Sequence, residues 1–419
     1  MNAHVEIRRA LSSIALLVAV ADLGGAQVPN ASPAATGLSG AFTARARGYD
    51  AIAWNPANLG LRDNPRFSFS LLAISGSSGL APITLADIAQ YSGKTLPRET
   101  REKWLQTVTS EGGESGSAEG GVTLVALSAG PFAFEVAGSA AGSTNMNAGA
   151  FEALMFGNAG LTGLPRDLDL DGSSGRVAAF TTAAASYGLS LGPLALGVTG
   201  KYVLGNAFAM AQDQGSVVAL DSMRVNFPVV YSWADSNAIA GMGVGLDVGL
   251  SYAVGRFAFG ATVQNAANGF TWDETKLRSK AATALLNGVD DSVSFEDRPY
   301  AEAPAALRAR VANDRFNPIV AVGLAYGLGS PLVVSIDARQ QTGDGILIGP
   351  TRRISGGLDA RIASVLHLRG GGSYITDGWG ASGGLGVDIG SFELGVGGAL
   401  RTVNGARVPA VTINLLSLR

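Results

Sequence analysis

The chain has 419 residues, of which 58 are glycine, 47% are hydrophobic and only 15% are charged, and its mean hydropathy is +0.24. A soluble enzyme of this length carries more charge and less glycine, whereas a helical membrane protein carries repeated long apolar runs. The composition is instead typical of a membrane β-barrel. The formal net charge of −3, without a basic stripe, argues against nucleic acid as a partner.

Residues 1–26 have the pattern of a secretory signal peptide. Two arginines precede an apolar run from Ala10 to Ala21, and small residues follow it up to Ala26. The run is too short to span a bilayer, so we expect cleavage after Ala26 and export to the bacterial outer membrane. The chain has no cysteine, so we expect no disulfide, thiolate chemistry or lipid attachment.

From Arg66 onward, apolar residues alternate with small or polar ones in segments that end at Gly or Pro turns. This pattern predicts an all-β fold, a transmembrane antiparallel β-barrel of about fourteen strands, and an even number is what such barrels require. The predicted strands are Arg66–Ser75, Gly120–Ala129, Phe132–Ser143, Ser174–Leu191, Pro193–Ala211, Ile239–Val254, Arg256–Phe270, Asp314–Leu328, Pro331–Thr342, Thr351–Ile362, Val365–Thr376, Gly378–Ile389, Ser391–Thr402 and Arg407–Leu418.

Tight turns alternate with long connections along these strands, which predicts short periplasmic turns, longer outer loops and both chain ends on the periplasmic side. The parity depends on Ser216 to Trp233, which forms either one further strand or a hairpin within an outer loop; we expect the hairpin. The predicted outer loops are Gly76–Glu119, Thr144–Ser173, Gln212–Ala238 and Thr271–Asn313.

Two of the outer loops have helical patterns. We expect one helix to be capped by Thr95 and to reach Glu111, with Trp104 on its apolar face, and a second helix to run from Ala148 to Phe156. These helices either form a hydrophobic docking surface or pack over the barrel mouth.

Five adjacent strands between Pro331 and Thr402 each combine an apolar face with a polar or small one. Because a charge that faces lipid is costly near the midplane, we assign the apolar faces to lipid and the charged faces to the lumen. We expect these charges to neutralise one another along a wet wall and to hold a plug, rather than to filter a substrate. The predicted lumen network comprises Asp337, Arg339, Arg353, Asp359, Arg361, Arg369, Asp388, Glu393 and Arg401.

Between the signal and the first strand, the stretch from Gly37 to Leu61 is rich in Gly and Ala and neither clearly helical nor alternating. Pro56 fixes its own φ and pushes Asn55 out of the helical region, while Asn side chains can bond to nearby backbone. The segment is therefore expected to contain a rigid, self-capped turn made of Trp54, Asn55, Pro56, Ala57 and Asn58.

The run Ala41–Ala44, followed by Asp50–Ala57 and Leu59, resembles the N-terminal hatch of the FadL long-chain fatty acid transporter superfamily, and is most similar to its PorV-like branch. Asn58 departs from the family's pattern, in which Gly usually follows Asn-Pro-Ala. The resemblance implies a hatch at residues 27–63, with Trp54 to Asn58 as its gating element, inside a barrel formed by residues 64–419.

The same resemblance implies a function. It predicts a barrel in outer-membrane lipid that passively takes up hydrophobic, fatty-acid-like small molecules. The alternative is a PorV-like barrel that transports nothing and docks secreted or surface proteins. An ion-paired lumen with a fixed hatch favours this alternative, and an apolar lumen with a movable hatch favours transport.

Catalytic chemistry has few candidates. The mature chain has one histidine, His367, for which we expect a structural hydrogen bond in the lumen. Asp167, Asp169 and Asp171 lack the later Glu of a calcium loop, so we expect an acidic turn there, with loose cation binding as the alternative. We therefore expect no enzyme, no metal and no cofactor. The Gly-rich stretch Gly241 to Gly249 predicts a strand face that a plug approaches closely.

Overall fold

The structure is a computed structural model that describes residues 31–157, 160–164, 167–219, 222–233, 239–286, 292–329, 331–343, 345–346, 350–363, 365–376, 378–403 and 406–418. The interpretation of residues 1–26 as a signal peptide lies outside these residues.

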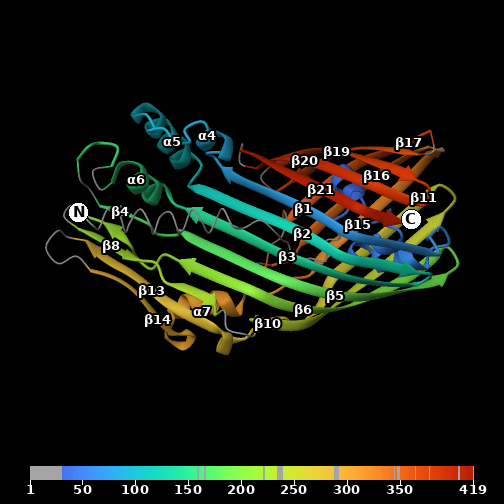
Figure 1. Ribbon diagram of the computed structural model, residues 1–419, viewed down its shortest axis with the longest axis horizontal. Helices are drawn as coiled ribbons and strands as arrows, with labels where there is room; N and C mark the ends of the chain where they lie inside the picture. The colour runs from blue at the N-terminus through green and yellow to red at the C-terminus, as the bar shows by residue number, and fades with distance from the viewer. Residues whose placement is uncertain are drawn as a thin grey trace.

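Fourteen antiparallel strands close into a barrel, which confirms the predicted fold class (Figure 1). Each strand pairs with the next one around the wall, and closure is made by the last strand pairing with the first from Phe69↔Leu418 to Ser77↔Ala410. The wall strands are β1 (Phe67–Ala81), β2 (Glu114–Ala129), β3 (Phe132–Met146), β5 (Ser174–Leu191), β6 (Leu194–Gln212), β10 (Gly241–Val254), β11 (Phe257–Asn268), β15 (Ile319–Gly329), β16 (Leu332–Gln341), β17 (Arg352–Ile362), β18 (Leu366–Ile375), β19 (Gly378–Ile389), β20 (Phe392–Val403) and β21 (Ala406–Leu418).

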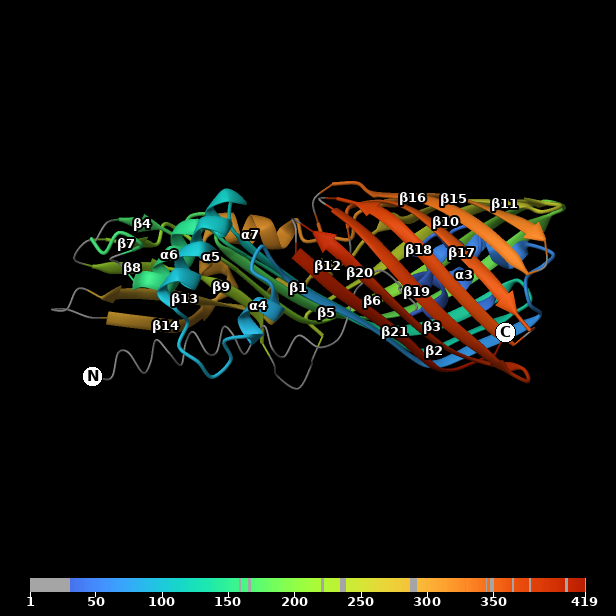
Figure 2. The ribbon, with the colours of Figure 1, turned by 90° about the horizontal axis from the view of Figure 1, so that it is seen from above.

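The remaining strands lie in the long connections at one end of the barrel, called here the loop end, and the tight connections lie at the other, the turn end (Figures 1 and 2). Within 216–233, β7 and β8 pair as a hairpin, and β9 pairs with β6 and β13, so this segment adds no wall strand and the even count stands. The loop-end strands are β4 (Leu168–Asp169), β7 (Val217–Val218), β8 (Met223–Asn226), β9 (Val229–Ser232), β12 (Thr271–Trp272), β13 (Leu277–Leu286) and β14 (Ser292–Pro299).

The first two strands are longer than predicted. Residues 76–81 of β1 pair in continuous register with residues 115–120 of β2, although both stretches are rich in Gly and Ser and suggest a loop. Backbone hydrogen bonds form a ladder whatever the side chains are, so the alternation of side chains alone predicts such strands to be too short.

The loop-end helices agree with the sequence pattern in part. Helix α6 runs from Ala148 to Phe156 as predicted, and the Asn147 side chain caps it. Helix α5 (Arg98–Ser110) begins after Pro97 without a side-chain cap, so the predicted cap at Thr95 is wrong. The short helices α4 (Leu85–Ala89) and α7 (Ala305–Ala312) were not predicted.

The two faces of the wall differ sharply. On β16, the side chain of Ile336 is 57% exposed, whereas those of its neighbours Ser335 and Asp337 are 1% and 3% exposed. The exposed apolar side chains form the outer face of the barrel, as lipid contact requires. No helix among the described residues has both the length and the apolar character needed to cross a membrane.

Residues 31–64, called here the N-terminal segment, lie inside the ring of strands (Figure 2). Short helical turns follow one another in this segment, and almost all of their side chains are buried. These turns are α2 (Pro33–Gly37), η1 (Gly48–Asp50), α3 (Ala51–Trp54) and η2 (Pro56–Gly60).

Candidate gate and lumen

The Asn-Pro-Ala-Asn turn is capped by its own first residue. Asn55 is extended, and its Oδ1 accepts a hydrogen bond of 3.1 Å from the backbone N–H of Ala57, while Pro56 occupies the first position of η2. Pro has no N–H to leave unpaired at this position, so the turn is capped by residues next to one another in the sequence.

Both asparagines of the turn also bond to other parts of the molecule, and both are fully buried. The Nδ2 of Asn55 donates to the carbonyl of Leu250 at 3.1 Å and to Oγ of Ser251 at 2.9 Å, both on β10. The Nδ2 of Asn58 donates to the carbonyls of Thr43 and Ala46 at 3.0 and 2.9 Å. Asn58 therefore folds the N-terminal segment back on itself, which the Gly usual in the FadL family could not do with a side chain.

Wall glycines allow the turn to approach closely. A Cβ at Gly197 of β6 would overlap the backbone of Pro56 and Ala57, and a Cβ at Gly249 of β10 would overlap the Asn55 side chain. Gly249 lies in the Gly-rich stretch for which such an approach was predicted. The turn and the wall are therefore in direct contact, without room for a methyl group between them.

Polar anchors on other strands hold the rest of the N-terminal segment. One carboxylate oxygen of Asp337 on β16 accepts hydrogen bonds from the backbone N–H groups of Phe42 and Thr43 at 3.1 and 2.7 Å. The Nε2 of Gln264 on β11 donates to the carbonyl of Ala53 at 2.5 Å. These bonds satisfy backbone groups that the short turns leave unpaired, so they hold the segment against the wall.

Trp54 lies between apolar and cationic groups. Its ring meets Phe42 edge to face with a centroid separation of 5.5 Å, and the guanidinium of Arg353 lies 6.0 Å from the ring centroid. The side chain is only partly buried, and its indole N–H has no hydrogen-bond partner among the described residues. Trp54 is therefore packed against both an aromatic ring and a guanidinium, and its indole nitrogen is itself buried.

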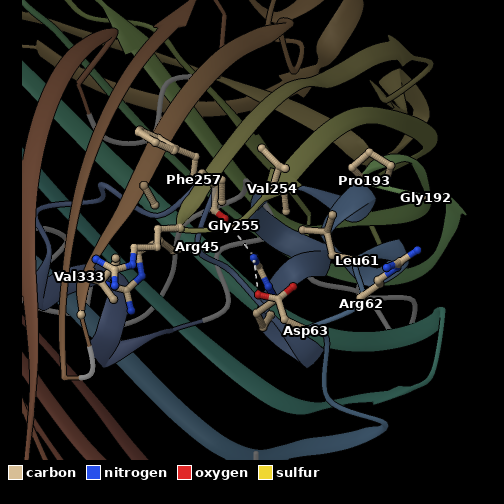
Figure 3. A pocket seen from close by; sticks show the side chains of 18 residues that line it. Arg45, Leu61, Arg62, Asp63, Gly192, Pro193, Val254, Gly255, Phe257 and Val333 are labelled. Carbon is tan, nitrogen blue, oxygen red and sulfur yellow. Dashed lines mark hydrogen bonds and ion pairs between the residues drawn. The ribbon is translucent and has the colours of Figure 1, made fainter.

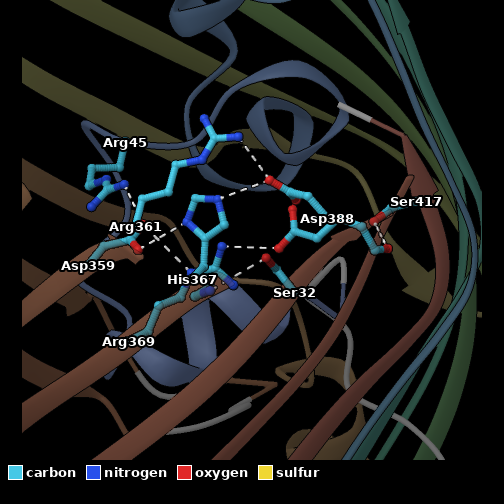
Figure 4. A network of polar contacts seen from close by, with 10 residues as sticks. Ser32, Arg45, Asp359, Arg361, His367, Arg369, Asp388 and Ser417 are labelled. Atoms are coloured by element: carbon cyan, nitrogen blue, oxygen red, sulfur yellow. Dashed lines mark hydrogen bonds and ion pairs between the residues drawn. The ribbon is translucent and has the colours of Figure 1, made fainter. Parts of the chain in front are cut away.

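An ion-pair network lies at the turn end of the lumen and joins the N-terminal segment to the wall (Figure 4). Arg45 donates to Asp359 of β17 at 2.7 Å, and Arg369 of β18 lies 3.6 Å from the same carboxylate. Burial lowers the pKa of the Arg45 guanidinium, and the charge of Asp359 opposes that shift. Arg369 also bonds to Glu393 of β20 at 3.0 Å. One carboxylate thus bridges a cation of the N-terminal segment and a cation of the wall.

His367 is part of the same network. Its Nδ1 lies 3.3 Å from Asp359 and its Nε2 lies 3.6 Å from Asp388. Asp388 is also paired with Arg361 at 3.0 Å. The ring therefore connects the two carboxylates, and it is surrounded by charge pairs rather than by a serine nucleophile.

The nine residues of the predicted lumen network do not form one cluster. Asp359, Arg361, Arg369, Asp388 and Glu393 meet at the turn end, and Asp337 instead binds backbone N–H groups.

The other three arginines of the predicted network lie elsewhere. Arg401 contacts Ser77 and Glu119, near the β1–β2 pair. Arg339 and Arg353 are directly opposite each other on β16 and β17, and neither forms an ion pair with a described residue. The lumen therefore holds two adjacent arginines that form no ion pair with a carboxylate among the described residues. Arg353 also lies close to Trp54.

Several anchoring residues were not predicted from the sequence. Arg45, Ser251 and Gln264 were missed, as was the buried pair Lys201–Asp247, whose atoms Nζ and Oδ1 are 2.6 Å apart. The four wall residues Ser251, Gln264, Lys201 and Asp247 lie on the inward-facing side of the strand alternation, but nothing in the sequence indicated that Ser251 and Gln264 would contact the N-terminal segment.

A cavity of about 800 Å³ lies at the turn end, between the N-terminal segment and the ends of β6, β10, β11 and β15 (Figure 3). Arg45, Leu61, Arg62 and Asp63 line it from the N-terminal segment. A smaller cavity of about 200 Å³ shares Arg45 with it and reaches Asp359, Arg361 and His367. The ion-pair network therefore borders open space on the turn side.

Aromatic side chains fill the opposite, loop end. The rings of Phe180, Phe270, Trp272 and Phe316 pack together with centroid separations of 5.1 to 5.5 Å. The indole N–H of Trp272 donates to Asp314, which also binds Arg176 through both carboxylate oxygens. Phe180 lies on the lumenal face of β5, so this cluster narrows the loop end of the lumen.

The acidic Asp167–Asp171 loop forms hydrogen bonds with Asn147. The amide of Asn147 donates to Oδ1 of Asp169 at 3.0 Å and to the carbonyl of Asp171 at 2.8 Å. Among the residues that the structure describes, no group of His, Cys, Asp and Glu side chains has the arrangement of a metal site.

Comparisons with known proteins identify the fold. No protein-family model matches the chain, and no curated protein matches it significantly. The P. putida toluene transporter TodX is similar in structure, with a TM-score of 0.56 and 13% identity over 95% of this chain and 99% of that one. The Ralstonia pickettii toluene transporter TbuX has a TM-score of 0.51 and 15% identity over 93% and 98% of the two chains. A Pseudomonas aeruginosa FadL homologue has a TM-score of 0.51 and 12% identity over 94% of this chain and 99% of that one.

The architecture defines a closed, fourteen-stranded antiparallel β-barrel whose lumen is occupied by its own N-terminal segment. More particularly, the chain has the fold of the FadL-type transporters, over nearly the full length of both partners in each comparison, which confirms the FadL resemblance at the level of fold. The comparisons give no support to the PorV-like branch.

Proposed function

We propose that this protein is a passive outer-membrane channel for hydrophobic small molecules, closed by its N-terminal segment. Of the described residues, 31–63 form the larger part of the hatch expected at 27–63, and Trp54 to Asn58 form its gating element. The observation that carries the proposal is the full-length FadL-type fold, since the structures that it matches are named as transporters of toluene and as a FadL homologue. A fold alone does not fix a cargo, so the site must carry the rest of the argument.

The bonds of the N-terminal segment support a gate that moves without the wall. The segment is held by side chains from separate strands, each through one or two hydrogen bonds or one ion pair, rather than by a strand ladder. Each such bond contributes about 0.5–1.5 kcal/mol net, so the segment can be released in steps that leave the barrel ladders intact. Burial lowers the free energy of a hydrophobic molecule by roughly 25 cal/mol for each Å² of apolar area removed from water, and this favours entry.

The ion pair between Arg45 and Asp359 is the kind of contact that favours the alternative, a docking barrel for secreted or surface proteins. That alternative gains nothing from the comparisons, whose named functions are transport. Catalysis is likewise not proposed, because His367 is surrounded by Asp359, Asp388 and Arg361.

We infer that the chain reaches the outer membrane through its first 26 residues. Mass spectrometry of the membrane form tests this inference and should give an N-terminus at Gln27.

The experiment that tests the channel is uptake of labelled hydrophobic probes. Cells that lack a transporter of this type would carry a plasmid with or without the gene for the protein, and accumulation of toluene and of a long-chain fatty acid would be followed over time. Faster accumulation of at least one probe is expected. Equal accumulation of both probes in the two strains, with the protein assembled in the outer membrane, contradicts the proposal.

A further inference from the structure

One carboxyl group of the wall is enclosed by the N-terminal segment. The side chain of Glu135 on β3 is 0% exposed. Its cross-strand partner on β5 is Ala184, and both Ala184 and Ala133, on the same face of β3, pack in one apolar cluster with α3 and Leu59. Glu135 therefore lies where apolar side chains of the segment meet the wall, out of contact with water.

The carboxyl group of Glu135 has few polar contacts. Its Oε1 accepts a hydrogen bond of 3.3 Å from Oγ1 of Thr123, and its Oε2 has no hydrogen-bond partner among the described residues. None of the described Lys, Arg or His side chains forms an ion pair with it. A carboxylate that is buried without a cation is costly, whereas a neutral carboxyl group needs only hydrogen bonds. This environment therefore accommodates the protonated form of Glu135.

The hydroxyl of Thr123 joins this carboxyl group to the start of the segment. The register between β2 and β3 shifts between Thr123 and Val125, and at this bulge Thr123 lies on the inner side, where it is 1% exposed. Its Oγ1 accepts a hydrogen bond of 3.1 Å from the backbone N–H of Ala31 and donates to Glu135. A change in the charge of Glu135 therefore acts on a bond that holds the segment.

The groups around Glu135 include one more acid. The turn η1 packs against β1, β2 and β3, and its Asp50 is 1% exposed and interacts electrostatically with Glu135. The other titratable side chain of η1, Tyr49, is also buried, α3 carries none, and the cross-strand partners of Glu135 are Ala126 and Ala184. Two like charges that are enclosed together repel strongly. Ionisation of Glu135 would therefore act against the packing of η1 on the wall.

We propose that Glu135 is a proton-binding latch of the gate: its carboxyl group is protonated while the N-terminal segment is in place, and loss of the proton to lumenal water releases the segment. The inference rests on the proposed function, because it assigns a regulator to the gate of that channel. The seated state binds one proton more than the released state, in which water hydrates the carboxylate. Raising the pH therefore lowers the stability of the seated state relative to the released state.

The test follows the segment with a nitroxide spin label. Because the chain has no cysteine, R62C gives one labelling site, at an exposed position of the segment just after η2. Electron paramagnetic resonance records the mobility of the label in the full-length protein in a non-ionic detergent, from about pH 6 to about pH 10. The mobile fraction is expected to rise about fivefold or more in R62C and to stay constant in R62C/E135Q, because Gln resembles the protonated carboxyl group and cannot ionise.

Two further variants sharpen the comparison. R62C/E119Q is the matched control, because Glu119 is a lumenal carboxylate 3.6 Å from the guanidinium of Arg401, and its mobile fraction should follow that of R62C at every pH. In R62C/D50N, release should require a higher pH, because the repulsion from Asp50 is gone. Infrared spectra at neutral pH should show a protonated carboxyl band in R62C that R62C/E135Q lacks. Heat-modified electrophoretic mobility would show that each barrel is assembled.

Equal pH dependence of R62C and R62C/E135Q overturns the proposal, as does a label in R62C whose mobility does not change with pH. Identical infrared carboxyl bands in these two variants also overturn it. Release of R62C/D50N at the same pH as R62C, or at a lower one, contradicts the repulsion assigned to Asp50. Because none of these readouts depends on transport, absence of probe uptake in cells at every pH would refute the channel and leave the link between Glu135 and the segment standing.

Discussion

The hydroxyl of Ser251 on β10 donates a hydrogen bond of 2.5 Å to Oδ1 of Asn58, in the interior of the barrel. The same hydroxyl oxygen accepts from Nδ2 of Asn55 at 2.9 Å. One wall side chain therefore binds both asparagines of the predicted turn. Asn58, which stands where the FadL pattern has Gly, therefore also binds the wall.

Replacing Ser251 by Ala is expected to loosen the N-terminal segment. Asn55 and Asn58 are fully buried and would each lose a partner, at a cost of about 1–3 kcal/mol for each group left unsatisfied. The prediction is a higher open probability in planar-bilayer recordings. Ser417→Ala is the control, because Ser417 is equally buried but donates to the carbonyl of Glu393 within the wall. Equal recordings for the two variants would remove Ser251 from the gate.

A methyl group at Gly197 is expected to displace the turn. A Cβ there would overlap the backbone of Pro56 and Ala57, whereas a Cβ at Gly200 on the same strand would meet no atom within 4 Å. Gly197→Ala should therefore raise protease sensitivity of the N-terminal segment and conductance of the barrel, and Gly200→Ala should change neither. Heat-modified electrophoretic mobility would show that both barrels are assembled. Protection of the segment in Gly197→Ala equal to that of wild type would contradict close packing of turn and wall.

Double-mutant cycles should divide the turn-end network into separate pairs. Arg45 and Asp359 are 2.7 Å apart and mostly buried, so Arg45→Gln and Asp359→Asn should show a coupling energy of roughly 1–3 kcal/mol. Arg361 pairs with Asp388 and is 51% exposed, so that coupling should be below about 1 kcal/mol. Asp359 and Arg361 are linked through His367 and Asp388, so their cycle should give a smaller coupling energy than that of Arg45 with Asp359. Thermal unfolding of the barrel measures all three, and a dominant Asp359–Arg361 term would refute the assigned pairs.

The unpaired lumenal arginines should make an opened channel prefer anions. Arg339 and Arg353 face each other across β16 and β17 without ion-paired carboxylates among the described residues. In a Pro56→Gly background, which loosens the turn, the reversal potential in a salt gradient should indicate anion selectivity. R339Q/R353Q should reduce that selectivity, whereas R352Q should not, because the neighbouring Arg352 is exposed on the outer side. Cation selectivity in the Pro56→Gly variant would be the contrary result.

Alternation along the chain was sufficient to predict the barrel, because one side of each strand must suit lipid and the other a polar lumen. The helix from Ala148 to Phe156 and the turn at Pro56 could also be predicted, since both depend on residues next to each other in sequence. The extension of β1 to Ala81 could not, because Gly and Ser carry no alternation signal there.

The contacts of the N-terminal segment with the wall could not be predicted, because they join residues far apart in the sequence. Arg45 and Asp359 are 314 positions apart, and Asn55 and Ser251 are 196 apart. Which inward-facing side chain meets which residue of the segment depends on the register of the segment inside the closed barrel. That register follows from packing at Gly197 and Gly249, and a single sequence does not record it.

The most direct test of the account is to lock the N-terminal segment to the wall. Thr36 and Thr412 have Oγ1 atoms 2.7 Å apart, and the chain has no cysteine of its own, so T36C/T412C can form one defined disulfide. S186C/T199C is the matched control, because those hydroxyls are also 2.7 Å apart but join β5 to β6 within the wall. Uptake of the hydrophobic probe that the wild type carries would be measured before and after reduction. The account predicts that oxidised T36C/T412C is slow and that reduction restores its uptake, while the control stays at the wild-type rate throughout. Uptake by oxidised T36C/T412C at the wild-type rate would contradict a gate that has to move.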